Sequence, residues 1–182
     1  MKTLTDMKTT RALVVTCALL LGPVFSLPVT AEETTAAAYT MAVIKNEAHG
    51  RRVTAGKYEQ AIDKITRGGV RAKDRFADQV NLCVAYTKTK DIENANASCS
   101  AALAGLKKQE TRATRSKKSP LYGNYKKDLA LALSNRGVLF AVSGDTKRAK
   151  ESFAAAIKLQ TSLSHIAESN LERLEQSALP DA

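Results

Sequence analysis

The stretch that decides the fold is LSNRGVLFAVSGDTKRAKESFAAA, residues 133–156. The same residue classes stand 54 positions earlier, where Asn81, Tyr86, Asp91, Ala95, Cys99 and Ala102 correspond to Asn135, Phe140, Asp145, Ala149, Phe153 and Ala156. A shorter offset of 34 residues aligns Tyr58, Glu59, Ala61 and Ile65 with Ile92, Glu93, Ala95 and Cys99. A period near 34 residues is typical of stacked helical hairpins. The sequence therefore predicts an all-α repeat fold and points toward binding another chain.

Apolar residues with helical spacing extend this pattern in both directions. The segments expected to be helical are 41–53, 58–66, 74–86, 91–106, 129–142, 146–159 and 165–176. Asn124 or Asp128 is expected to open the fifth of these helices, and Ser164 to cap the last. The last helix has one charged face, which is what a repeat array needs where it ends.

The first 31 residues read as a secretory signal peptide. A basic start is followed by the ten-residue apolar run 12–21, the breaker Gly22-Pro23 and small residues before Glu32. Cleavage is expected after Ala31, with 32–39 as a linker, 40–177 as the repeat domain and 178–182 as a tail. This predicts a periplasmic or secreted protein. An uncleaved anchor is the alternative, although the run is shorter than the roughly 20 apolar residues of a membrane span. Lipidation of Cys17 is rejected because the apolar run continues past it.

Two cysteines, Cys83 and Cys99, remain beyond the leader. An exported chain meets an oxidising compartment, where a pair of thiols tends to form a disulfide. Closing a loop of about 16 residues would contribute about 3 kcal/mol. The alternative is two buried free thiols that fill helix-packing positions.

With these residues in view, the chain resembles the tetratricopeptide repeat (TPR) family over residues 40–177. The resemblance implies an α-solenoid of about three antiparallel hairpins with a C-terminal capping helix. It implies that Gly137 and Ala149 are a close helix–helix contact, filled by Phe140 and Phe153, and that Cys83 and Cys99 face each other across one hairpin. The clearest departure is Arg136, which stands where the family prefers an aliphatic residue. The first helix of the first unit also matches badly, at Lys45, Ala48, His49 and Arg52.

Binding residues follow from the same resemblance. Peptide-binding members of the family carry an asparagine in the concave groove, at the position of Asn81, Asn135 and, less clearly, Asn170. An amide side chain donates and accepts, so it can hold a peptide backbone whatever its side chains are. Val84, Lys88 and Val138 would line the same wall. The leading hypothesis is a non-catalytic exported module that binds a peptide or partner protein in this groove.

A basic insertion at residues 107–127 supports a second hypothesis. It carries eight basic residues against Glu110 alone, a net charge of +7. We expect two prolonged helices that meet near Pro120. The basic side chains at Lys107, Lys108, Arg112, Arg115, Lys117 and Lys118 would contact an anionic partner, making this an envelope-associated structural protein. The other reading is a solvated face that prevents self-association. Only Tyr122 and Tyr125 could stack on bases, and this argues against nucleic acid.

The sequence offers no catalytic constellation. Its two histidines, His49 and His165, lie on different units without a cysteine or carboxylate at metal-ligand spacing. No phosphate-binding glycine loop or nucleophile motif occurs. We therefore expect no enzyme activity, cofactor or metal.

Overall fold

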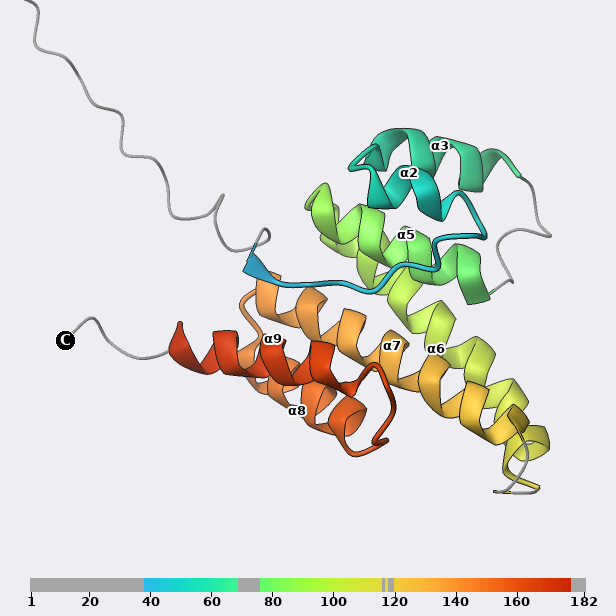
Figure 1. The fold of residues 1–182 in the computed structure, drawn as a ribbon. Helices are drawn as coiled ribbons and strands as arrows, with labels where there is room; N and C mark the ends of the chain where they lie inside the picture. The colour runs from blue at the N-terminus through green and yellow to red at the C-terminus, as the bar shows by residue number, and fades with distance from the viewer. Residues whose placement is uncertain (1–37, 69–75, 116, 118–119, 178–182) are drawn as a thin grey trace, which may run out of the picture. The chain divides into compact units, whose positions relative to one another are not determined.

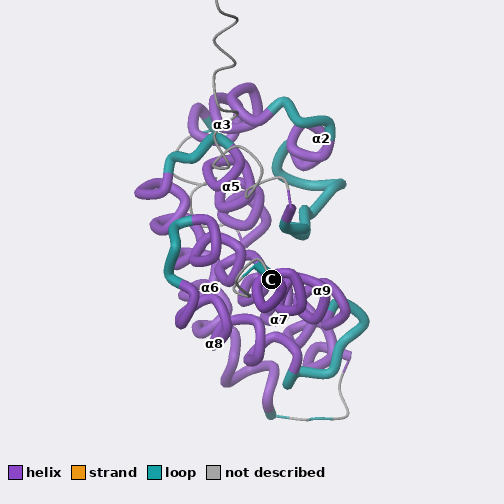
Figure 2. Tube along the Cα trace, turned by 90° about the vertical axis from the view of Figure 1, so that its left-hand side faces the viewer, coloured by secondary structure: helices purple, strands orange, loops and turns teal. Residues whose placement is uncertain are grey.

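The computed structural model describes residues 38–68, 76–115, 117 and 120–177, apart from the side chains of residues 108 and 112. The predicted signal peptide, the linker as far as residue 37, Lys118 and the predicted tail lie outside this part of the chain. The described residues form helices and no strand (Figures 1 and 2). The helices are α2 (Gly50–Thr54), α3 (Tyr58–Arg67), α5 (Phe76–Lys88), α6 (Ile92–Thr114), α7 (Pro120–Val142), α8 (Thr146–Ile157) and α9 (Ser164–Gln176). The all-α prediction is confirmed.

Each helix packs mainly on its neighbours in the sequence. The pairs α2 with α3, α5 with α6, and α7 with α8 are in contact, and α9 packs on α8. Alternate helices also touch, because α5 contacts both α2 and α7, and α7 contacts α9. The helices α5, α7 and α9 therefore form a continuous set of neighbours.

Two of the hairpin turns use the same local chemistry. Asp91 and Asp145 are the N-caps of α6 and α8, and each carboxylate accepts a hydrogen bond from the backbone N–H three residues later. The residue before each cap has a left-handed backbone, with φ of 61° at Lys90 and 80° at Gly144. Glycine adopts this conformation without steric cost, whereas lysine does not.

Two predicted helix boundaries are wrong. Helix α7 begins at Pro120 and not at Asn124 or Asp128, because proline is well suited to the first helical position. The long α6 and α7 thus meet on either side of residues 115–119, as expected for the insertion. The predicted helix 41–53 is reduced to α2, Gly50–Thr54, and residues 40–44 are not helical.

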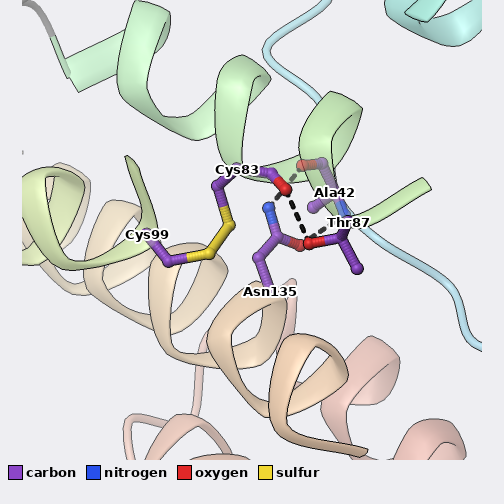
Figure 3. Close-up of a disulfide and its surroundings, with 5 residues drawn as sticks. All are labelled: Ala42, Cys83, Thr87, Cys99 and Asn135. Carbon is purple, nitrogen blue, oxygen red and sulfur yellow. Dashed lines mark hydrogen bonds between the residues drawn. A yellow bond between two sulfur atoms is a disulfide. The ribbon is translucent and has the colours of Figure 1, made fainter. Parts of the chain in front are cut away.

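Cys83 and Cys99 form a disulfide that joins α5 to α6, with an S–S distance of 2.02 Å and a Cα–Cα distance of 4.9 Å (Figure 3). The corresponding positions of the next hairpin are Gly137 and Phe153. Phe153 is fully buried, and a Cβ at Gly137 would lie 2.5 Å from its ring. The expected close approach of α7 and α8 at Gly137 is therefore present.

Candidate functional site

Residues 39–44, which we call the strap, cross three helices that are far from them in the sequence. The strap passes from α9 to α7 to α5 before the chain turns into α2 (Figure 1). Its backbone groups find partners on the side chains of one asparagine from each helix. We call Asn170, Asn135 and Asn81 the asparagine row.

Each asparagine of the row holds both backbone groups of one strap residue. Asn170 Oδ1 accepts from Thr40 N at 2.9 Å, and its Nδ2 donates to Thr40 O at 2.8 Å. Asn135 makes the same two bonds with Ala42, both at 2.8 Å (Figure 3). Asn81 Oδ1 accepts from Ile44 N at 3.0 Å, and its Nδ2 donates to Ile44 O at 3.1 Å.

This pairing resembles a hydrogen-bonded residue pair of an antiparallel sheet, with side-chain amides in place of a second strand. Only residues 40, 42 and 44 take part, because successive backbone groups of an extended chain point to opposite sides. The backbone N–H groups of Met41 and Val43 make no hydrogen bond with any described residue.

The asparagine row is closed off from solvent. The exposed fractions of Asn81, Asn135 and Asn170 are 0%, 1% and 0%. A buried amide without partners costs about 1–3 kcal/mol for each unsatisfied group. The strap is therefore part of the folded structure, because it satisfies three amides that the helices alone leave unpaired.

Side chains of the strap alternate between two sets of apolar neighbours. Tyr39 is buried in the cluster that contains Val138, and Met41 packs against that cluster. Met41 and Val43 also pack against the cluster that contains Val84. Ala42 and Ile44 pack against a third cluster, formed by Val80, Ala102 and Leu131. Thr40 is exposed.

A tight loop connects the strap to α2. Asn81 Nδ2 also donates to Glu47 O at 3.1 Å and to Ala48 O at 3.2 Å. Ala48 and His49 both have left-handed backbones, with φ of 45° and 57°. A Cβ at Gly50 would lie 2.0 Å from Ile44 O, so only glycine fits at the start of α2.

Charged groups also face the strap and its loop. Lys88 Nζ donates to Tyr39 O at 3.2 Å, and burial lowers the pKa of Lys88. On α7, burial raises the pKa of Asp128, and the nearby carboxylate of Glu47 raises it further. The loop thus lies against a carboxyl group that ionises less readily than usual.

All six binding residues proposed from the sequence lie at the strap, and we call this set the seat: Asn81, Val84, Lys88, Asn135, Val138 and Asn170. In this structure the seat contacts the chain's own residues and no separate peptide. The strap was not predicted, because residues 41–53 were expected to be helical. The poor match of Lys45, Ala48, His49 and Arg52 to a first repeat helix was the available signal.

The basic insertion forms the far ends of α6 and α7. Lys107, Arg115 and Lys117 are exposed and make no ion pair with a described residue. The backbones of Lys108 and Arg112 lie in α6, their side chains are outside the described part, and Lys118 is outside it altogether. Lys126 lies 5.8 Å from the centre of the Tyr122 ring, a cation–π distance.

Arg136, the departure from the repeat pattern, lies in a cleft between α6, α7 and α8. Its guanidinium is 5.8 Å from the centre of the Phe140 ring, and that of Arg148 is 4.4 Å from the same ring. The buried Nε of Arg136 has no hydrogen-bond partner among the described residues. Burial lowers the pKa of Arg136, and the positive charge of Arg148 lowers it further. The cleft measures about 360 Å³.

The described residues contain no group of three side chains able to hold a metal ion. His49 contacts Arg52, and the ring of His165 contacts the carbonyl of Ser162, so the two histidines lie in separate surface contacts. No helix in the described ranges has both the length and the apolar character needed to cross a bilayer.

No protein-family model, no curated protein and no solved structure matches this chain. The contacts of the seat are therefore the best guide to its function.

Proposed function

We propose that this chain is an exported, non-catalytic interaction module, a TPR-like α-solenoid that binds an extended peptide or partner protein in its concave groove. The contacts between alternate helices support the solenoid, because in such an array the first helix of each hairpin packs on the first helix of the next. The groove in question is the row of α5, α7 and α9 that carries the seat.

The observation that supports this function is the asparagine row in use. Three buried amides each hold the N–H and C=O of one residue in an extended segment. Recognition of this kind requires an extended backbone and tolerates different side chains. A surface of this chemistry binds peptides in general, and the strap is the peptide that it holds in this structure.

A first experiment frees the seat with a single substitution. Ala42→Pro removes the N–H that Asn135 accepts, which we expect to weaken strap binding by about 1–3 kcal/mol. A labelled peptide with the sequence of residues 38–45 should then bind the variant chain, as measured by fluorescence anisotropy. The matched control is Val43→Pro, because the Val43 N–H has no described partner, and this variant should bind far less peptide.

The seat itself is tested in the Ala42→Pro background. Replacing Asn81 and Asn170 with alanine should abolish peptide binding while circular dichroism stays helical. Peptide binding that is unaffected by the loss of both amides would show that the seat is not the binding surface.

Exposure of Lys107, Arg115 and Lys117 favours a second function, association with an anionic envelope surface. Charge reversal at Arg115 and Lys117 should then release the protein from anionic vesicles. Binding to those vesicles should also weaken with added salt, because exposed charges are screened. Binding that is insensitive to salt would contradict this function.

A further inference from the structure

We infer that the strap is an exchangeable internal ligand of the seat, and that its pattern describes the partner: an extended segment of another protein with free N–H groups at three alternate positions and apolar side chains at the positions beside them. This inference rests on the proposed function and specifies both the partner and how access to the seat is controlled.

The backbone requirement comes directly from the hydrogen bonds. Asn170, Asn135 and Asn81 accept from the N–H groups of residues 40, 42 and 44, and the N–H groups between them are not used. A partner therefore cannot carry proline at any of the three alternate positions, because proline has no N–H. At the two positions between them, the seat places no demand on the N–H group.

The side-chain requirement comes from the apolar clusters. Positions 39, 41 and 43 pack against the clusters that contain Val138 and Val84. Position 42 holds an alanine that packs with Ile44 against the third cluster, so a small residue fits there. Position 40 is exposed and accepts any residue with an N–H. The expected partner pattern is apolar, any, apolar, small, apolar, apolar.

Covalent attachment makes the strap a strong competitor. A short tether holds a ligand at an effective concentration of the order of millimolar. A partner of equal intrinsic affinity at micromolar concentration would then occupy the seat in roughly one molecule per thousand. Access depends on the exposed loop residues Lys45, Asn46 and Glu47, where the strap joins the helical body.

The experiment cuts this tether and leaves the whole chain present. A protease site is inserted between Lys45 and Asn46, both exposed, and cleavage turns the strap into a separate fragment that the seat still binds. A labelled peptide of residues 38–45 is then added in excess, and exchange is followed by fluorescence anisotropy. We expect the peptide to bind the cut chain and to bind the uncut chain at least about a hundredfold more weakly.

A methyl scan of the peptide backbone tests the pattern. N-methylation at position 40, 42 or 44 should weaken binding by about tenfold or more, because a buried amide oxygen loses its donor. N-methylation at position 41 or 43 is the matched control and should change binding by less than about threefold. Replacing Met41 with aspartate should also weaken binding, whereas replacing Thr40 with aspartate should not.

The outcomes separate the inference from the function on which it rests. Peptide binding with equal losses at positions 42 and 43 would overturn the pattern while leaving the groove as a binding site. Equal binding to the cut and uncut chains would overturn the strap as a competitor. No peptide binding to the cut chain, with the strap fragment removed and the chain still helical, would overturn both.

Light scattering of the uncut chain covers the remaining occupant. We expect a monomer at all concentrations. A dimer that Ala42→Pro abolishes and Val43→Pro retains would overturn the inference, because the occupant of the seat would then be the strap of a second copy.

Discussion

The hairpins α5–α6 and α7–α8 place different chemistry at the same pair of positions. In the first hairpin, Cys83 and Cys99 are joined covalently at a Cα–Cα distance of 4.9 Å. In the second, Gly137 lies directly beneath the Phe153 ring. Both pairs occupy the place where two antiparallel helices approach most closely. The comparison shows that one backbone arrangement accepts either a cross-link between two small residues or an aromatic ring over a glycine.

The two solutions differ in what they stabilise. In the chain-entropy model, a disulfide acts mainly by restricting the unfolded chain. The Gly137–Phe153 contact acts in the folded state, through burial and close packing of a large side chain. The first hairpin should therefore depend on the redox state of its surroundings, and the second should depend on shape alone.

The largest expected effect is loss of the cross-link. Reduction of the disulfide between Cys83 and Cys99 should lower the free energy of unfolding by about 3 kcal/mol, because the unfolded chain regains its conformational freedom. Urea denaturation with and without a reducing agent measures this difference. A stability that is the same in both conditions would contradict the role of the bridge.

The comparison itself can be tested by grafting one solution onto the other hairpin. Cys83→Gly combined with Cys99→Phe copies the Gly137–Phe153 pair into α5 and α6. This double variant should be more stable than the reduced wild-type chain and insensitive to reducing agents. A graft less stable than the reduced chain would show that the two hairpins are not interchangeable.

A smaller loss is expected from adding one methyl group to the second hairpin. In Gly137→Ala the new Cβ would lie 2.5 Å from Cε1 and 2.6 Å from Cδ1 of the buried Phe153 ring. Overpacking of this kind costs about 1–3 kcal/mol, measured by urea denaturation.

The matched control is Gly105→Ala in α6, where a Cβ meets nothing within 4 Å. That change should stabilise the chain by up to about 1 kcal/mol, because alanine favours helix more than glycine does. Equal effects of the two substitutions would contradict the close contact at Gly137.

The smallest expected effect concerns the turn of the second hairpin at acidic pH. The backbone N–H of Arg148 donates to Asp145 and holds the pKa of that carboxyl below its usual value, and the Arg148 side chain lowers it further. A carboxyl with a lowered pKa in the folded state stabilises the protein above its unfolded pKa, near 3.8, and loses this contribution as the pH falls through the folded value.

Melting temperatures between pH 7 and pH 2 should therefore separate wild type from Asp145→Asn at neutral pH and bring them together in acid. Arg148→Met should reduce the separation, because it removes the side-chain partner but keeps the backbone donor. A separation that persists unchanged at pH 2 would show that ionisation of Asp145 contributes nothing.

The sequence predicted most of the helical architecture because its information is local and periodic. Apolar spacing located α3, α5, α6, α8 and α9, and Asp91 and Asp145 marked two helix starts. The pair Cys83 and Cys99 followed from its place in the repeat. The start of α7 was wrong by several residues, because the basic insertion has no apolar spacing there to mark it.

The strap could not be predicted in the same way, because what keeps residues 40–44 extended lies far away in the sequence. Thr40 and Asn170 are 130 residues apart, and Ala42 and Asn135 are 93 apart. Without those amides, residues 41–53 read as a weak helix. The asparagine row itself was identified from the sequence, and its partner in this structure was not.

The pairing of Thr40 with Asn170 also sets an order of events during folding. The strap is made first and α9 last, so the earliest ordered residues meet their final partner only when the chain is nearly complete. Closing such a long loop is slow compared with forming neighbouring helices. The helical body therefore forms with the seat still empty, and the N-terminal segment is the last piece to dock.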